Sequence, residues 1–264
     1  MLPAMEKLYD MHCHLGFAPA PEAVAATGAQ AGIAALSCTV EPAEYERLRP
    51  ALNAAPNAAV ALGAHPWWIA DGRMSNAELE RFCALAPATR FIGEVGLDFA
   101  GPRDADESRR AQIAALDRIL AACDAAPAAE ETSGKLISVH AVNAAATVLG
   151  LLEEHGTTGR HTVIFHWFSG TSEELARARD LGCYFSVGPR MLVSRRGREY
   201  ARQIPLDRLL LETDMPSRAG DSLPANVWQA ELNNALTGIA QLKAADRGAL
   251  AAQIATTSAE LLRF

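Results

Sequence analysis

The sequence predicts an α/β protein whose eight strand–helix units form a (β/α)8 TIM barrel, and three observations favour that fold class. Short apolar segments alternate with longer helical patterns, which is typical of βα units and a parallel sheet. Eight such apolar segments occur. The 264 residues also match the roughly 250 residues of a typical barrel. A doubly wound open sheet shares this local pattern and stays the alternative. Because no linker is long enough to divide the chain, we expect one domain over residues 1–264.

Eight strands are expected, each a short apolar segment. In chain order they are Leu8–Leu15, Ile33–Val40, Ala59–His65, Phe91–Leu97, Leu136–His140, Thr162–Phe168, Cys183–Val187 and Leu209–Thr213.

The stretches between these strands are expected to be helical. Ser75–Glu78 and Thr171–Glu174 have the spacing of capping boxes, which open helices. Ala- and Leu-rich segments from Ala225 onward supply the last one or two helices. Polar loops are expected over residues 100–108 and 124–134. Between those loops, four residues fall on one helical face: Ile113, Leu116, Leu120 and Cys123.

Composition and charge exclude several classes of protein. Half of the chain is hydrophobic and the net charge is −7, so the chain has ample material for a core and is not disordered. No apolar run approaches the roughly 20 residues that span a bilayer, and the first residues lack a signal-peptide stretch, so no membrane is expected as a partner. Five cysteines without paired spacing indicate reduced thiols and a cytoplasmic location. The acidic balance argues against nonspecific coating of nucleic acid, although bound metal ions can still receive phosphate.

The first predicted strand contains two histidines that suit a metal ion. Side chains alternate along a strand, so Asp10, His12 and His14 share one face while Cys13 points the other way. Two imidazoles placed in this way can hold one cation. A pair of hydrogen-bonded core histidines is the structural alternative.

Further candidate ligands stand where other strands end. Glu94, His140, His166 and Asp214 all lie at or near such an end, and the ends of barrel strands converge on one mouth. A buried glutamate and aspartate beside four imidazoles are costly without compensating positive charge. Divalent metal is the simplest compensation, and one bridging carboxylate can serve two ions.

On these residues the chain resembles the TatD family of metal-dependent hydrolases, within the amidohydrolase-like barrels. Six motifs in order carry the resemblance over nearly the whole chain. They are Asp10-Met-His-Cys-His14, Gly63-Ala-His-Pro66, Gly93-Glu-Val-Gly-Leu-Asp98, His140, His166-Trp-Phe-Ser-Gly170 and the segment from Ile204 to Pro216.

The resemblance implies a ligand set and an activity. It implies that His12, His14 and Asp214 hold one metal, that His140 and His166 hold the other, and that Glu94 bridges them. It also implies metal-dependent hydrolysis of DNA, with one branch of the family linked to the deacylation of mischarged tRNA.

The chain departs from the family pattern after His140. Val142 stands where the family usually has an arginine, which would suit a substrate phosphate. This substitution weakens the expectation of a nucleic-acid substrate.

Three further residues are candidate substrate contacts, each with a structural alternative. His65 either contacts substrate or transfers a proton, or makes a structural hydrogen bond. Trp67 either stacks on a base or lines a pocket, or it packs. Arg190 belongs to a group with Arg195, Arg196 and Arg198 that contacts phosphate or forms a solvated helix start.

We therefore expect a two-metal phosphodiesterase, most specifically a deoxyribonuclease, with DNA or another phosphodiester as partner. Asp214 and Glu94 are the expected catalytic residues, and Asp214 is the candidate to receive the proton of the attacking water. The donor set suits zinc or manganese better than magnesium, although added magnesium is compatible with activity. One alternative is an esterase or amidase, including an aminoacyl-tRNA deacylase. Another is a metal-holding subunit without catalysis. Protein partners stay unknown.

Overall fold

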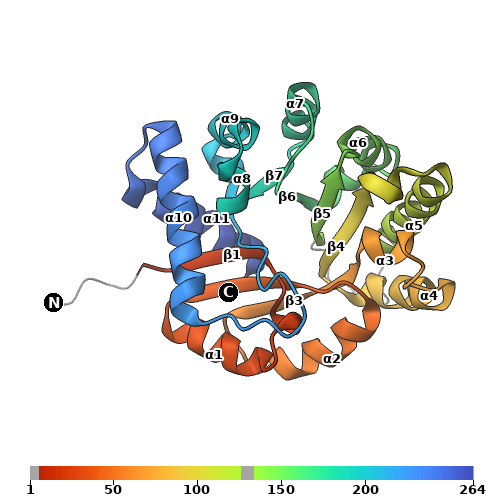
Figure 1. Ribbon diagram of the computed structural model, residues 1–264, viewed down its shortest axis with the longest axis horizontal. Helices are drawn as coiled ribbons and strands as arrows, with labels where there is room; N and C mark the ends of the chain where they lie inside the picture. The colour runs from red at the N-terminus through yellow and green to blue at the C-terminus, as the bar shows by residue number, and fades with distance from the viewer. Residues whose placement is uncertain (1–5, 126–133, 264) are drawn as a thin grey trace. The chain divides into compact units, whose positions relative to one another are not determined.

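The computed structural model describes residues 6–125 and 134–263 and contains the eight expected strands in the expected order (Figure 1). The chain divides into two compact units. The first comprises Met1–Ser37, Leu48–Val60 and Phe185–Phe264, and the second comprises Cys38–Arg47 and Ala61–Tyr184. The expectation of one domain over residues 1–264 stays a prediction. Within the described ranges, no helix has both the length and the apolar character that crossing a bilayer demands.

The first unit contains both ends of the described chain. Its strands are β1 (Leu8–Cys13), β2 (Ile33–Cys38) except for Cys38, β7 (Tyr184–Val187) except for Tyr184, and β8 (Leu209–Leu211). Its longer helices are α1 (Pro21–Gln30), α9 (Arg195–Gln203), α10 (Ala225–Lys243) and α11 (Arg247–Leu262), with the short α8 (Pro189–Val193) after β7. Short 3-10 helices are η1 (Leu15–Phe17) and η5 (Leu206–Arg208). Figure 1 shows α8 and α9 beside α10, and both contact it.

The first and last strands of the chain are neighbours in this unit. The backbone N–H of Asp214 donates to the carbonyl of His12 at 2.9 Å, and that of His14 donates to the carbonyl of Met215 at 2.8 Å. Parallel pairing joins β1 to β2 and β7 to β8. An adjacent first and last strand is typical of a closed barrel and argues against the doubly wound alternative.

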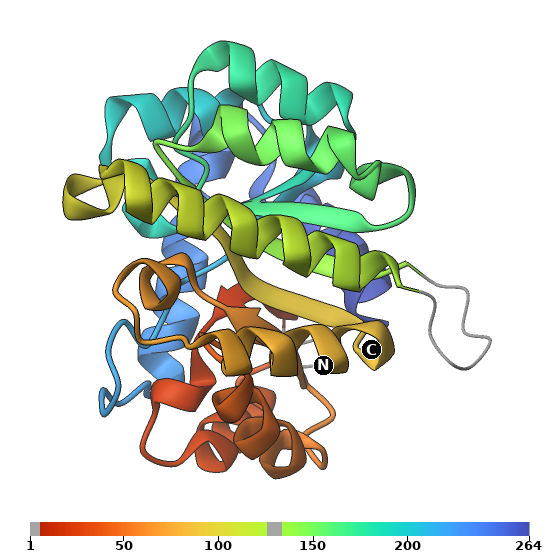
Figure 2. The same ribbon diagram turned by 90° about the vertical axis from the view of Figure 1, so that its right-hand side faces the viewer.

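The second unit contains the middle of the chain. Its strands are β3 (Ala58–Ala64), whose first residues belong to the first unit, β4 (Phe91–Asp98), β5 (Leu136–Val142) and β6 (Thr162–His166). Its helices are α3 (Pro66–Ala70), α4 (Asn76–Leu85), α5 (Asp106–Asp124), α6 (Ala145–Glu154) and α7 (Ser172–Asp180), and α2 (Pro42–Leu52) has residues in both units. Short 3-10 helices are η2 (Ala86–Ala88), η3 (Gly101–Asp104) and η4 (Thr157–Gly159). Helices α4 and α5 pack against each other (Figure 2).

Strand β4 pairs in parallel with β3 on one side and β5 on the other. Gly96 of β4 lies opposite His140 of β5 and has φ +145°. A Cβ at position 96 would lie 2.0 Å from the His140 carbonyl oxygen, so only glycine permits this approach. The approach brings the ends of β4 and β5 together.

The expected helix signals are present. Thr171 and Glu174 form a complete capping box at the start of α7. Ser75 caps α4 by accepting from the backbone N–H of Glu78. On α5 the expected apolar face is buried at Leu116, Leu120 and Cys123 and half-buried at Ile113.

Of the two predicted loops, the first is partly helical and most of the second lies outside the described residues. The loop expected over residues 100–108 contains η3, and α5 already begins at Asp106, because Asp106 and Glu107 suit the first turn of a helix. Of the loop expected over residues 124–134, residues 126–133 lie outside the described chain.

Several strands end earlier than expected, and their ends carry the functional side chains. Strand β1 ends at Cys13 because His14 has left the extended region, with φ −124° and ψ 62°. The residue after β6, Trp167, has φ +39°, and Asp214 beyond β8 has φ +56°. A positive φ interrupts a strand ladder, so β6 stops before the predicted Phe168. Strand β8 ends at Leu211, two residues before the predicted Thr213.

Candidate metal centre

The first unit brings together three predicted metal ligands: His12, His14 and Asp214. His14 Nε2 lies 3.1 Å from Asp214 Oδ1, and His12 Nε2 lies 4.0 Å from the same oxygen. The His12 and His14 rings meet edge to face at 5.1 Å. Both imidazoles are buried, and the Asp214 side chain is 22% exposed. His12 from β1, His14 directly after it and Asp214 beyond β8 therefore form a compact donor set.

The Asp10 carboxylate supports this cluster by accepting hydrogen bonds from the backbone next to the ligands. Its Oδ1 accepts from the backbone N–H of His12 at 3.2 Å and of Thr213 at 3.0 Å. Its Oδ2 accepts from Thr213 Oγ1 at 2.5 Å and from the Trp228 indole at 2.7 Å. Burial raises the pKa of Asp10 to about 6, and these hydrogen bonds oppose the rise. The carboxylate thus ties the strand carrying His12 to the segment leading to Asp214.

Arg190 is the predicted substrate contact that lies at this cluster. Its Nη1 is 3.4 Å from Asp214 Oδ2, and its Nη2 donates to the Ser217 hydroxyl. Buried Glu212, two residues before Asp214, accepts from Ser186 Oγ at 2.6 Å.

The second unit brings three imidazoles to one oxygen of Glu94. Glu94 Oε1 lies 2.7 Å from His140 Nδ1, 2.9 Å from His166 Nε2 and 3.2 Å from His65 Nε2. His140 Nδ1 and His166 Nε2 are themselves 3.3 Å apart. Glu94 is 2% exposed. A buried carboxylate at the focus of three rings requires positive charge, whether from protonated histidine or from a metal ion.

His140 is held between two carboxylates. Its Nδ1 faces Glu94, and its Nε2 lies 3.0 Å from Asp98 Oδ2. Burial alone lowers the pKa of His140, but hydrogen bonds to Asp98 and Glu94 outweigh it and raise the pKa to about 9. Burial raises the pKa of Asp98, whereas its bonds to His140 and Trp67 bring it below the usual value. The two carboxylates therefore favour the protonated, positively charged form of the His140 ring.

Asp98 contacts both the loop that follows β4 and a predicted metal ligand, His140. It does hold the loop, because its Oδ1 accepts from the backbone N–H of Ala100 at 2.9 Å. Its Oδ2 also orients His140 and accepts the Trp67 indole N–H at 2.5 Å. A carboxylate on the far nitrogen of a metal-binding histidine is the usual outer partner of such a ligand. The signal available in the sequence was its place at the end of the Glu94 strand.

His65 and Trp67 lie beside the Glu94 cluster. His65 Nδ1 accepts the backbone N–H of Trp67 at 3.1 Å, so in the neutral ring Nε2 carries the proton and faces Glu94. The Trp67 ring meets those of His65 and His140 edge to face and is 38% exposed. Arg103 lies 4.5 Å from the centre of the Trp67 ring. Trp67 thus packs on the cluster and presents part of its ring to solvent.

Both clusters suit a divalent cation. Candidate ligand atoms lie within 4.8 Å of one another in the set His12, His14 and Asp214, and likewise in the set His65, Glu94 and His140. Imidazole and carboxylate donors at this spacing match the ligands of zinc and manganese. His65 joins the second set in the geometry, although its proton on Nε2 favours a hydrogen bond to Glu94 over ligation.

Comparison with known proteins identifies the relatives of this chain. The profile of the family described as TatD related DNase matches residues 9–263. The mouse protein named putative deoxyribonuclease TATDN3 is 29% identical over 255 residues, covering 89% of this chain and 81% of the relative. The protein named 3'-5' ssDNA/RNA exonuclease TatD from Edwardsiella piscicida is 32% identical over 160 residues, covering 58% of this chain and 54% of the relative.

Solved structures support the fold. The crystal structure of YJJV, a TATD homolog from Escherichia coli K12, superposes with a TM-score of 0.80 at 22% identity, covering 97% of this chain and 98% of that one. A TatD-family hydrolase structure from Entamoeba histolytica gives a TM-score of 0.75 at 15% identity, with 97% and 98% coverage. The predicted (β/α)8 fold class is confirmed.

Proposed function

The chain belongs to the TatD family of metal-dependent hydrolases, and from that premise we propose that it hydrolyses phosphodiester bonds in DNA with two divalent cations. The observation that carries the proposal is the pair of donor clusters. One surrounds Asp214 in the first unit and the other surrounds Glu94 in the second. Relatives named deoxyribonuclease and ssDNA/RNA exonuclease support the choice of nucleic acid.

Six residues would hold the cations. His12, His14 and Asp214 would hold one, and Glu94, His140 and His166 would contribute to the other. Bound there, a divalent cation supplies Lewis acidity to the phosphate and lowers the pKa of a bound water. The family resemblance adds that Glu94 ligates both cations, which stays a prediction. Zinc and manganese are the proposed metals because imidazoles dominate the donor set.

The exposure and contacts of each residue suggest its role in the reaction. Asp214 is partly exposed, unlike Glu94, and would accept the proton of the attacking water at a carboxylate oxygen. The negative charge of Glu94 would orient the three imidazoles that surround it. Asp98 would keep Nε2 of His140 protonated, which leaves Nδ1 as the ligand atom. His65 and Trp67 would line the approach of the substrate.

A second candidate activity, hydrolysis of a carboxylic ester or amide, rests on Val142. This residue ends β5 opposite Asp98 in register and offers no charge where the resemblance expects an arginine. The same clusters would then polarise a carbonyl, as in an aminoacyl-tRNA deacylase. A non-catalytic metal-holding subunit is the remaining alternative.

A cytoplasmic location is also part of the proposal. The five cysteines of the sequence lack the paired spacing of a disulfide framework, which supports a reducing compartment.

The test is cleavage of an end-labelled single-stranded DNA oligonucleotide. Metal-stripped protein receives magnesium, manganese or zinc, and Glu94→Ala serves as the control for contaminating nuclease. Metal-dependent cleavage that disappears in Glu94→Ala supports the proposal, and the product ladder gives the direction of attack. Failure with every metal, from folded and metal-loaded protein, contradicts it. Turnover of 4-nitrophenyl acetate would then favour the esterase, and its absence the non-catalytic subunit.

A further inference from the structure

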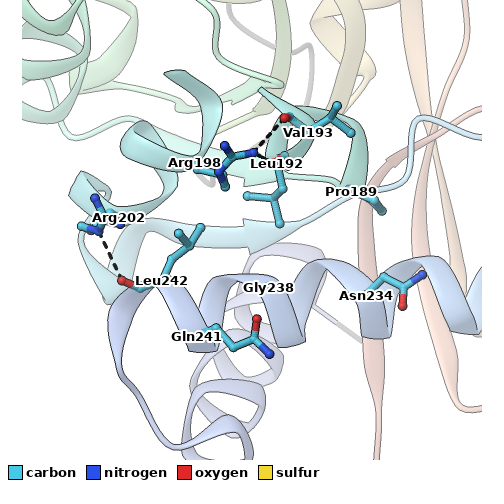
Figure 3. Close-up of a pocket in the computed structure, with 9 residues that line it drawn as sticks. All are labelled: Pro189, Leu192, Val193, Arg198, Arg202, Asn234, Gly238, Gln241 and Leu242. Carbon is cyan, nitrogen blue, oxygen red and sulfur yellow. Dashed lines mark hydrogen bonds between the residues drawn. The ribbon is translucent and has the colours of Figure 1, made fainter. Parts of the chain in front are cut away.

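The arginines between residues 190 and 198, which follow strand β7, differ in their surroundings. Arg198 is engaged in structure, because its Nη1 donates to the carbonyls of Leu192 at 2.9 Å and Val193 at 2.8 Å (Figure 3). It lines a pocket of about 450 Å³ between α8, α9 and α10. Arg195 and Arg196 are exposed on the first turn of α9. Arg190 is the member of the group that contacts a predicted metal ligand, Asp214.

Local sequence directs Arg190 to this place. Gly188 precedes α8, and a Cβ there would lie 3.0 Å from the Glu212 carbonyl oxygen and 3.1 Å from Glu212 Cγ. Glycine therefore lets the start of α8 approach the segment that carries Asp214. Pro189 then begins the helix, a position that proline favours. Arg190 follows immediately and reaches Asp214.

The guanidinium is partly exposed there and makes one long charged contact and one contact to a neutral group. The Nη1 to Asp214 Oδ2 distance of 3.4 Å is long for a charged hydrogen bond, and the Arg190 side chain is 42% exposed. Its Nη2 donates to the Ser217 hydroxyl, a neutral partner. A guanidinium has five donors in a planar fork, which matches two oxygens of one anion. Arg190 thus has N–H donors that face solvent next to the donor cluster and can bind an anion.

A cation bound by His12, His14 and Asp214 would compete with Arg190 for the negative charge of Asp214. Asp214 gives its negative charge both to Arg190 and to any ion held with His12 and His14. Two positive groups would then share one carboxylate, and an anion arriving from solvent would relieve their repulsion. A phosphodiester carries one negative charge on two non-bridging oxygens, which suits the fork. A neutral carboxylic ester offers no such charge.

We propose that Arg190 binds the non-bridging oxygens of a substrate phosphodiester and selects it over neutral esters. The proposal rests on the proposed function, since it deepens the substrate class of the same site. It gives the chain a phosphate-binding cation although Val142 supplies none.

The experiment compares Arg190→Gln, Arg190→Lys and Arg196→Gln in the full chain loaded with manganese. Arg196→Gln is the matched control, because it removes the same charge from an exposed arginine on the next helix. Calorimetry measures the Kd for inorganic phosphate. Kinetics measure KM for bis(4-nitrophenyl) phosphate and for 4-nitrophenyl acetate. Titration of the metal-free proteins with manganese alone measures metal affinity.

Arg190→Gln is expected to raise the Kd for phosphate and the KM for the diester by at least about tenfold, as the loss of a charged hydrogen bond implies. KM for the acetate should change less than about twofold where it is measurable. Arg190→Lys should lie between, since it keeps the charge and loses the fork. Manganese should bind Arg190→Gln at least as tightly as the parent, because a competing cation is gone. Arg196→Gln should match the parent.

Equal phosphate affinity in the parent and Arg190→Gln would overturn the proposal. An equal loss in Arg196→Gln would also overturn it, because the effect would then be one of general charge. Weaker manganese binding in Arg190→Gln would assign Arg190 to cluster assembly instead. Phosphate binding is measured without turnover, so it tests Arg190 even if the protein cleaves no diester. A protein that binds phosphate through Arg190 but cleaves no diester would contradict the proposed function alone.

Discussion

Asp98 Oδ2 lies 3.0 Å from His140 Nε2, and the same oxygen accepts the indole N–H of Trp67 at 2.5 Å. This one carboxylate oxygen sets the orientation of a predicted metal ligand and of a partly exposed aromatic ring. Because His140 Nε2 is occupied by Asp98, the opposite nitrogen faces Glu94. Asp98, which is not itself a proposed metal ligand, therefore decides that His140 offers Nδ1 to a metal ion.

Replacing Asp98 tests this relationship. Asp98→Asn removes the charge that favours a proton on His140 Nε2, so the ligand nitrogen becomes less basic. We expect the affinity of the Glu94 cluster for zinc to fall by about 10- to 100-fold. Competition with a chromophoric chelator measures it. Asp104→Asn is a suitable control, since Asp104 lies on the neighbouring η3 and is exposed. Unchanged zinc affinity in Asp98→Asn would contradict the orienting role.

Removal of metal is expected to lower thermal stability. A ligand at about 100 times its Kd stabilises the native state by about 2.7 kcal/mol. For a chain of this size each kcal/mol corresponds to roughly 2–4 °C, so a chelator should lower the Tm by about 5–10 °C. Differential scanning calorimetry with and without chelator measures the shift. The double variant His14→Ala/Glu94→Ala should show little change on chelation, and an equal shift in that variant would place the metal elsewhere.

Strand alternation and strand-end position were sufficient to predict the candidate donor residues, whereas their division into two sets came from the family resemblance. Asp10, His12 and His14 follow from a period of two, and Glu94, His140, His166 and Asp214 follow from where parallel strands end. The side chains that contact these residues from distant parts of the chain could not be predicted from the sequence pattern. Trp228 donates to Asp10 from 218 positions away, and no local pattern encodes that contact. Arg190 and Arg198 looked equivalent in the sequence, and only the carbonyls around Arg198 separate their roles.

Asp10 is expected to contribute to stability through its four hydrogen bonds. Asp10→Asn turns one acceptor oxygen into a donor that faces N–H or O–H groups, which leaves buried donors unsatisfied. We expect the free energy of unfolding to fall by about 3 kcal/mol. Urea denaturation in the presence of chelator measures this without a contribution from metal. Asp221→Asn, at an exposed position, should change stability by less than about 0.5 kcal/mol. Equal stability of the Asp10 and Asp221 variants would contradict the prediction.

Lys135 is expected to stabilise the turn before β4. Its Nζ donates to the carbonyls of Ala86 at 2.8 Å, Pro87 at 3.1 Å and Thr89 at 2.9 Å. Lys135→Met keeps the apolar stem and removes all three bonds, so we expect a loss of about 2 kcal/mol.

The same lysine gives a dependence on pH. Burial lowers the pKa of Lys135 below 10.5, so the unfolded chain binds more protons there between the two values. The stability of the parent relative to Lys135→Met should therefore increase as the pH rises toward 10.5. Urea denaturation of both proteins at pH 7, 8 and 9.5 measures the difference. A difference that shrinks with rising pH would mean that the carbonyls stabilise the ammonium more than burial penalises it.

Asp214→Asn tests the proposed proton acceptor. The amide keeps the size of the side chain and one oxygen, but it cannot accept the proton of the attacking water. We expect kcat for DNA cleavage to fall by at least about 100-fold, with the far-UV circular dichroism of the parent. Because Asn also binds metal less well than Asp, the assay is run at saturating manganese, with occupancy measured on the same sample. Asp221→Asn should retain full activity. Turnover within a few-fold of the parent at full occupancy would move the role of proton acceptor from Asp214 to another residue.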